Sequence, residues 1–158
     1  MTSSKAPSLF GSPSPNHTAH AAPAAAPTEA HSLLDLMYDG FYLLFLLKGK
    51  HAPQDAEAFR ERIKQFLTAF ERGATRMNAS AEDVYACKYA FCATVDEAVL
   101  MSGFKVKEAW QRLPLQVQFF GEQLAGEQFF EKLEELRRQG APRVQAMEVF
   151  HMCLLLGF

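Results

Sequence analysis

The chain has 158 residues, the length of one domain, and 49% of them are apolar, including 14 phenylalanines. This composition supplies an ample hydrophobic core. Its 16 basic and 18 acidic residues give a net charge of −2, so no long-range field favours binding to nucleic acid or to an anionic membrane surface.

The N-terminal segment, residues 1–31, is a low-complexity tail of proline, alanine and small polar residues. It has too little apolar surface to offset the entropy lost on ordering, so we predict that it is disordered. No basic region followed by an apolar stretch indicates a secretory signal. The most apolar segment, Leu33–Leu47, is shorter than the roughly 20 residues that span a bilayer. It also carries Asp35 and Asp39, and we interpret it as a buried core helix.

From position 32 onward the signals are helical throughout, and we predict an all-α domain over residues 32–158. Ser32 with Asp35, and Ser80 with Asp83, resemble capping pairs that begin helices. No segment shows the alternation or the turn residues of a β-hairpin. The helices are expected at residues 32–48, 55–77, 80–101, a short stretch after Pro114, 127–139 and 143–156, with a charged loop at 102–112.

Large aromatic residues recur at helical spacing and are assigned to the core. These residues are Phe59, Phe66, Phe70, Phe91, Phe129 and Phe130. The three cysteines, Cys87, Cys92 and Cys153, form no CxxC motif, so we expect reduced, buried thiols in a cytoplasmic compartment and no zinc site. The chain ends in the apolar sequence HMCLLLGF, from which we expect the natural protein to continue beyond Phe158.

Two adjacent acids, Asp96 and Glu97, interrupt the apolar segment YAFCATVDEAVL, Tyr89–Leu100. A buried carboxylate without a partner costs several kcal/mol or takes up a proton. At helical spacing Asp96 ends an aromatic stripe, whereas Glu97 ends a stripe of alanines that allows close helix packing. Each acid therefore either pairs with a fixed partner inside the fold or lies on a functional surface.

No group of residues indicates catalysis. Adjacent helical residues diverge by about 100°, so Asp96 and Glu97 do not converge on one substrate atom. His151, in an apolar helix, is expected to be a core histidine, and the segment Gly121–Gly126 lacks the pattern of a phosphate-binding loop. We therefore predict a protein that is not an enzyme and has no metal or cofactor.

Three blocks of the sequence resemble the cytoplasmic domain of the TssL family of type VI secretion, also called DotU or IcmH-like. They are YAFCATVDEAVL, the block FFGEQLAGEQFFEKLEEL at 119–136, and MEVFHMCLLLGF at 147–158. Together with Trp110 they extend the resemblance over residues 33–158. The chain departs from the family pattern at Phe120 and at Ala125–Gly126, which affects local contacts only.

The resemblance implies a structural subunit whose six to eight helices form two packed bundles with a cleft between them. It implies the cytoplasmic domain of a bacterial inner-membrane protein, attached by a C-terminal anchor that lies outside this chain. The implied partners are TssM (IcmF-like), the baseplate proteins TssK and TssE, and TssJ through TssM. A homodimer is left open.

Five residues are candidates for the partner-binding cleft, namely Asp96, Glu97, Trp110, Glu122 and Gln123. For the acids, a structural role with a nearby Arg, Lys or helix N-terminus is the alternative. Trp110 either anchors a partner or folds back onto the helices. Two other functions stay open: a type IVB DotU/IcmH protein that stabilises IcmF, and a helical domain that binds a small molecule. Neighbouring genes would separate the two secretion systems.

Overall fold

The computed structural model describes residues 29–122 and 125–158, and these residues contain helices but no strand. The predicted all-α class is therefore confirmed. The elements in chain order are α1 (Leu33–Leu36), α2 (Tyr38–Lys48), α3 (Ala56–Arg76), α4 (Ala81–Leu100), α5 (Lys107–Arg112), α6 (Leu115–Phe120), α7 (Ala125–Gln139), the 3-10 helix η1 (Ala141–Arg143) and α8 (Val144–Leu155).

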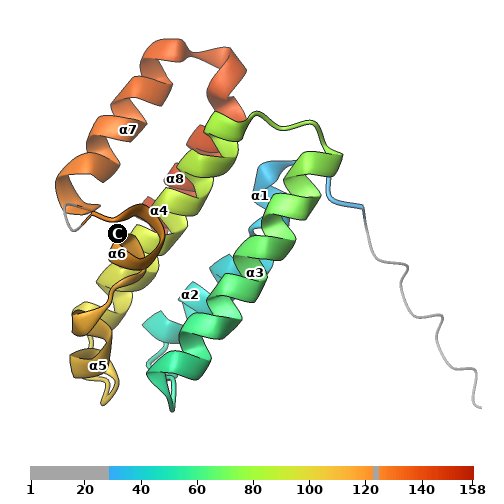
Figure 1. Ribbon diagram of the computed structural model, residues 1–158. Helices are drawn as coiled ribbons and strands as arrows, with labels where there is room; N and C mark the ends of the chain where they lie inside the picture. The colour runs from blue at the N-terminus through green and yellow to red at the C-terminus, as the bar shows by residue number, and fades with distance from the viewer. Residues whose placement is uncertain (1–28, 123–124) are drawn as a thin grey trace, which may run out of the picture.

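The helices form two groups that meet along α4, as Figure 1 shows. Helices α1, α2 and α3 lie on the right of this view, and α4 to α8 lie on the left. Helix α4 contacts α2 and α3 of the first group and α5 to α8 of the second. Thirteen of its 20 residues are buried, which explains why its sequence is apolar on almost every face.

Side chains cap the starts of three helices. The Ser32 hydroxyl accepts the Asp35 N–H at 3.1 Å, and the Ser80 hydroxyl accepts the Asp83 N–H at 3.1 Å. Both predicted caps are therefore confirmed. Asp55 does the same for α3, where its carboxylate accepts the Ala58 N–H at 2.7 Å. Each cap satisfies a backbone donor that has no partner within the helix.

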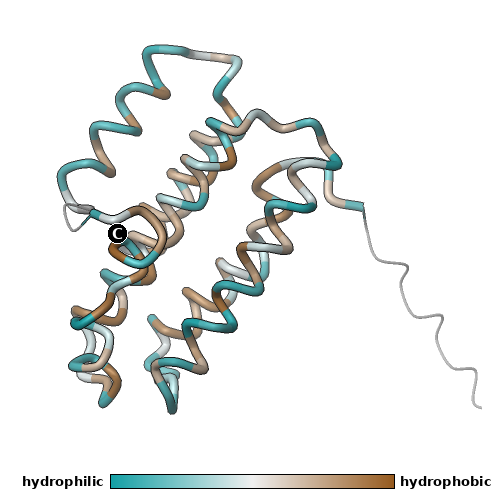
Figure 2. The backbone as a smooth tube through the Cα atoms, viewed as in Figure 1, coloured by the Kyte–Doolittle hydropathy of each residue, from teal (hydrophilic) through white to brown (hydrophobic). Residues whose placement is uncertain are grey.

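Helices α3 and α7 are amphipathic, and teal and brown alternate along both in Figure 2. The aromatic assignments mostly follow this pattern: Phe59, Phe70, Phe91 and Phe129 are buried. Phe66 is only partly buried and packs against Phe91. The assignment of Phe130 to the core is wrong, because its side chain is 53% exposed. Adjacent helical residues point about 100° apart, so only one of the pair can face α8.

Three other sequence predictions are corrected. The first predicted helix is interrupted at Met37, whose N–H donates to the carbonyls of both Leu33 and Leu34, the tight geometry of a helix end. The predicted loop at 102–112 contains α5, because Val106 and Trp110, one turn apart, are both buried. His151 is exposed on α8 and is not a core histidine.

Two glycines allow α3 to approach the first helices closely. A Cβ atom at Gly40 of α2 would lie 2.7 Å from the rings of Phe66 and Phe91. A Cβ atom at Gly73 of α3 would lie 2.5 Å from the Leu36 side chain. The lack of a side chain at Gly40 and Gly73 therefore allows the short distance between α3 and the pair α1–α2.

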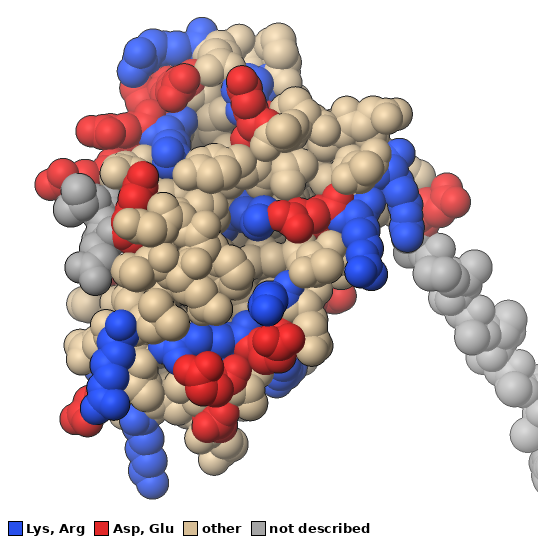
Figure 3. All heavy atoms as spheres, in the orientation of Figure 1, with Lys and Arg blue, Asp and Glu red and all other residues tan. Residues whose placement is uncertain are grey.

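Ion pairs join elements that are distant in sequence. The Arg143 guanidinium donates to Asp83 at 2.5 Å and to Glu82 at 3.1 Å, which ties the start of α8 to the start of α4. Lys88 of α4 pairs with Glu71 of α3. On the face shown in Figure 3 basic and acidic side chains are mixed. Within the described part of the chain, no helix has the length and hydropathy to cross a membrane.

The three cysteines are free and buried, as the sequence predicted. Burial raises the pKa of each thiol, and the pKa of Cys153 rises to about 12. The thiols are therefore protonated at neutral pH and are small apolar side chains within the core.

Candidate functional site

Asp96 lies on α4 and is buried, with only 4% of the residue exposed. Its Oδ1 atom accepts the indole N–H of Trp110 at 2.8 Å and the backbone N–H of Leu115 at 2.9 Å. Its Oδ2 atom accepts the backbone N–H of Gln116 at 2.9 Å. Leu115 and Gln116 are the first two residues of α6, so Asp96 caps a helix that lies 19 residues further along the chain.

Arg60 of α3 holds the other side of the same junction and is only 4% exposed. Its guanidinium donates to the carbonyls of Ala109 at 2.9 Å and Leu113 at 3.1 Å, near the end of α5. The guanidinium also lies over the Trp110 ring, 4.8 Å from its centre. A cation thus meets the carbonyl end of α5, and an anion meets the N–H end of α6. This junction, Arg60–Trp110–Asp96, connects the two helix groups.

Two opposing influences act on the ionisation of Asp96. Burial raises the pKa of its carboxyl group above the ordinary value. The donors of Gln116, Leu115 and Trp110 and the charge of Arg60 lower the pKa, but they do not cancel the cost of burial. Three N–H donors fit the ionised carboxylate, which offers acceptors only. The geometry therefore gives Asp96 a structural role, the alternative that the sequence left open.

Glu97, the next residue, is half-buried and lines a groove of about 350 Å³. Its carboxylate has no hydrogen-bond or ion-pair partner among the described residues. The groove is bounded by α4, α5, α6 and the first turn of α7, so it lies within the second helix group. Its other lining residues are Asp96, Leu100, Gln111, Pro114, Gln116 and Gly126.

Gln116 also lines this groove and is 2% exposed. Its Nε2 atom donates to the Tyr89 carbonyl at 3.1 Å, which fixes the orientation of the amide. Its Oε1 atom is buried and accepts no hydrogen bond from the described residues. A buried acceptor without a donor costs roughly 1–3 kcal/mol, so a donor entering the groove would recover this cost.

Neither Trp110 nor Glu122 lines the groove. Trp110 is fully buried and does not project from a loop, so the alternative in which it folds back onto the helices holds. Burial, and after it the nearby charge of Glu122, raises the pKa of the Tyr89 hydroxyl to about 12. Gln123 lies outside the described residues. Of the five predicted residues, Trp110 thus contacts Asp96, and among the described residues only Asp96 and Glu97 line the groove.

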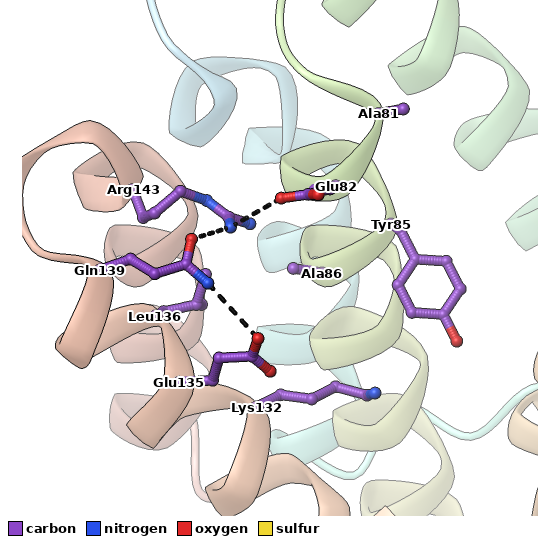
Figure 4. A pocket seen from close by; sticks show the side chains of 9 residues that line it. All are labelled: Ala81, Glu82, Tyr85, Ala86, Lys132, Glu135, Leu136, Gln139 and Arg143. Carbon is purple, nitrogen blue, oxygen red and sulfur yellow. Dashed lines mark hydrogen bonds and ion pairs between the residues drawn. The ribbon is translucent and has the colours of Figure 1, made fainter.

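A second hollow, of about 410 Å³, lies between the first turns of α4 and the last turns of α7. Figure 4 shows that its charged groups point toward one another. Arg143 contacts Glu82 and Gln139, and Gln139 in turn contacts Glu135. Lys132 points toward the tyrosines of α4 and lies 4.7 Å from the centre of the Tyr89 ring. These polar groups satisfy one another, so the hollow has no acceptor comparable to Gln116.

Comparison with known proteins assigns the chain to a family. A family model described as type VI secretion system protein DotU matches residues 32–158. The chain belongs to the DotU family. Its fold is similar to the cytoplasmic domain of TssL from Acinetobacter baumannii, with 48% identity, a TM-score of 0.79 and coverage of 82% of this chain and 83% of that chain.

A second DotU-like structure is SciP/TssL from enteroaggregative Escherichia coli 042. It is 29% identical, with a TM-score of 0.72, and the match covers 80% of this chain and 73% of that chain. The search among curated proteins gave no match. The resemblance deduced from the three sequence blocks is therefore confirmed, and the family is a structural component of the type VI secretion system.

Sequence reasoning missed two residues of this DotU-family site. Arg60 lies one turn from Ala56 and from Ile63, both buried. Its place on the apolar face of α3 was the available signal for a buried cation. Gln116 follows Leu115 in a helix too short to show a period. Its contact with the Tyr89 carbonyl, 27 residues away, could be found only in the folded chain.

Proposed function

We propose that this chain is the docking domain of a TssL-type subunit of the type VI membrane complex, and that the groove beside Glu97 receives a basic side chain of a partner protein. The proposed partners are the baseplate proteins TssK and TssE and the membrane-complex protein TssM, with TssJ reached through TssM. Family membership supports a subunit of this complex. The contacts with named partners rest on the resemblance and on the chemistry of the groove.

The two acceptors in the groove carry the proposal. Glu97 offers a carboxylate, and Gln116 offers a buried Oε1 atom, both on the lining of one hollow. Lysine and arginine side chains carry only donors and a positive charge. An entering Lys or Arg would therefore pair with Glu97 and satisfy Gln116 in one step. A charge-assisted hydrogen bond of this kind is stronger than a neutral one.

The groove has the character of a docking surface, and we propose no reaction for it. Asp96 is committed to three donors of its own chain, and the rest of the groove lining offers Glu97 no base or nucleophile. The chain corresponds to the cytoplasmic domain of TssL proteins, and we place it on the cytoplasmic side of the bacterial inner membrane.

The test is the binding of purified TssK, TssE and the cytoplasmic part of TssM to this chain and to Glu97→Gln, measured by isothermal titration calorimetry. The substitution keeps size and polarity and removes the charge. We expect at least one partner to bind about tenfold or more weakly, since the loss of a charged pair at an interface costs at least about 1.4 kcal/mol.

Glu61→Gln is the matched control, because Glu61 is an exposed carboxylate on α3, remote from the groove. It should bind all partners as the unchanged chain does. The melting temperatures of both variants should also remain close to that of the unchanged chain. Equal affinities for Glu97→Gln and Glu61→Gln across all three partners would refute the groove as the docking site.

A further inference from the structure

Two hollows lie end to end between α2 and α3, two helices of the first group (Figure 1). The first, of about 370 Å³, lies between the end of α2 and the start of α3. The second, of about 350 Å³, lies between the start of α2 and the middle of α3. Leu43 and Arg62 line both hollows, so the two adjoin. We call them together the α2–α3 groove.

The two helices contribute matching rows of residues to the α2–α3 groove, at the spacing i, i+4, i+7 on α2 and i, i+4, i+7, i+11 on α3. These rows are Asp39, Leu43 and Leu46 on α2, and Ala58, Arg62, Gln65 and Ala69 on α3. Residues at such intervals share one side of a helix, and rows of this kind are the surface on which another helix packs. The α2–α3 groove is therefore shaped to receive a third helix laid along it.

The lining of the α2–α3 groove is largely apolar. Phe59, Ile63 and Phe91 are buried in the core and form its floor. Leu43 and Phe66, by contrast, are only partly buried. Covering partly exposed apolar side chains is favourable in proportion to the area removed from water, so a helix placed here would gain from contact with both.

The α3 side of the groove has small side chains at its two ends. Ala58 and Ala69 are exposed, whereas every other exposed side chain of α3 is charged or polar. Both alanines line the α2–α3 groove. A small side chain at each end leaves room for the backbone of another helix to come close to α3.

A cation lies where the two hollows meet. Arg62 is exposed, and its guanidinium has no hydrogen-bond or ion-pair partner among residues 29–122 and 125–158. The carboxylate of Asp55, in the first hollow, already accepts the Ala58 N–H, and Asp39 lies in the second hollow. The midpoint of the groove therefore offers an unpaired positive charge with apolar surface on both sides.

We infer that the α2–α3 groove receives an amphipathic helix of a partner protein, with large apolar residues at positions i and i+7 and an acidic residue at i+3 or i+4. The α3 residues of the two hollows are centred about seven positions apart, or about 10 Å along the helix, which is two turns of the partner helix. A cavity of roughly 150 Å³ holds a benzene ring, so each hollow accommodates a leucine or phenylalanine side chain. The acidic residue then faces Arg62.

The position of the charge favours a helix over a lipid. An acyl chain carries its charged group at one end, whereas Arg62 lies at the midpoint of the groove, between two apolar hollows. A flat bilayer surface does not follow a groove between two helices. Recognition of an amphipathic helix through apolar residues at regular intervals is a recurrent mode of protein binding, and the rows on α2 and α3 match it.

The probe is a synthetic alanine-rich peptide of about 18 residues, long enough to be helical alone, with leucine at i and i+7 and glutamate at i+4. It is titrated into the whole chain, isotopically labelled, and followed by NMR. We expect the amide resonances of Leu43, Phe66 and Ala69 to shift and those around Glu97 to remain in place. A peptide with lysine instead of glutamate should bind about fivefold or more weakly.

Arg62→Glu should invert this preference, so that the lysine peptide binds more tightly than the glutamate peptide. A loss of structure alone would weaken both peptides equally and could not exchange their order. Arg72→Glu is the matched control, because Arg72 is an exposed arginine on the same helix that lines neither hollow. It should keep the preference for the glutamate peptide.

Ala69→Glu tests the shape of the groove independently of Arg62. The substitution places a charged side chain at an exposed position of the lining, and it should weaken the binding of both peptides about tenfold or more, since this charge would be covered without a partner. Thr68→Glu is the control, because Thr68 is exposed and points about 100° away from Ala69. Both variants should melt close to the unchanged chain.

Three results would overturn the proposal: no shift with either peptide, shifts confined to residues outside the α2–α3 groove, or the same peptide preference in Arg62→Glu and Arg72→Glu. Shifts of the groove resonances on dilution of the chain alone would instead assign the groove to a second copy. Shifts with phosphatidylethanolamine and phosphatidylglycerol vesicles, without a response to the peptides, would assign it to lipid. Either assignment also refutes the partner helix.

The α2–α3 groove and the groove beside Glu97 share no lining residue. Glu97→Gln should therefore leave the binding of both peptides unchanged. Failure of the docking proposal for Glu97 leaves the helix-binding proposal standing, and the reverse holds as well, because the two are measured with different probes and different variants.

Discussion

The junction around Asp96 and the outer face of α2 invert the usual distribution of polar and apolar residues. At the junction a carboxylate, a guanidinium and an indole are buried together. On α2, two tyrosines and a phenylalanine face outward. The difference lies in the partners: each buried charge has its donors or acceptors inside the chain, whereas the exposed rings have no partner among the described residues. Whether a side chain is buried in this protein therefore depends on the hydrogen-bond and ion-pair partners available to it as well as on its hydrophobicity.

The largest expected effect comes from removing the anion of the junction. Asp96→Ala leaves the indole N–H and two backbone N–H groups buried without an acceptor, and it removes one of the negative charges near Arg60, which keeps its ion pair with Glu57. We expect a loss of about 3–5 kcal/mol in the free energy of unfolding. Urea unfolding followed by circular dichroism measures this loss.

Asp39→Ala is the control for this substitution, since Asp39 is exposed in the first turn of α2. It should cost less than about 1 kcal/mol. Similar losses for the two alanine variants would mean that the hydrogen bonds of Asp96 contribute little, and the contrast between the junction and the surface would disappear.

A smaller effect is expected on the inner side of α2, opposite the exposed Tyr38, Tyr42 and Phe45. Gly40→Ala places a Cβ atom 2.7 Å from the rings of Phe66 and Phe91, and Phe91 is fully buried. We expect a net loss of about 1–3 kcal/mol from overpacking, although alanine favours the helix by up to about 1 kcal/mol. Thermal unfolding of the variant checks the sign.

Gly126→Ala is the matched comparison, because nothing lies within 4 Å of a Cβ atom at this helical glycine. It should raise stability slightly or leave it unchanged. If Gly40→Ala also raised stability, the inner side of α2 would be less tightly packed than the structure shows. The distinction between its two faces would then be lost.

The smallest effect concerns the pH dependence of stability. Because burial raises the pKa of Asp96 in the folded chain, the native state binds this proton more tightly than the unfolded state does. The stabilising contribution is fully present below the unfolded value, 3.8, and is lost as the pH rises through the folded value. The stability of the unchanged chain relative to Asp96→Asn should therefore fall as the pH increases from about 3.5 toward neutral.

Urea midpoints of both chains at several pH values within this window measure the difference. A relative stability that rises with pH would show that the three N–H donors and Arg60 outweigh the cost of burial. The junction would then prefer the charged carboxylate more strongly than its burial suggests. That outcome would sharpen the comparison with the exposed acid Asp39, which accepts no such hydrogen bonds from another helix within residues 29–122 and 125–158.

Local features of the sequence determined most of the secondary structure. The caps at Ser32 and Ser80 and the apolar period of α3 are set by residues within one or two turns of each other, so they can be recognised in the sequence. The same holds for the buried phenylalanines Phe59 and Phe70. The three motif blocks determined the family, because each is a run of consecutive residues.

Only the tertiary structure decided what the polar residues do. Asp96 meets Trp110, Leu115 and Gln116 at separations of 14, 19 and 20 residues, and Arg60 meets the end of α5 about 50 residues away. A helical period tells which face a side chain occupies but not which group covers that face. For the same reason the sequence could not distinguish buried Trp110 from exposed Phe130, or reveal that α2 leaves its aromatic face open.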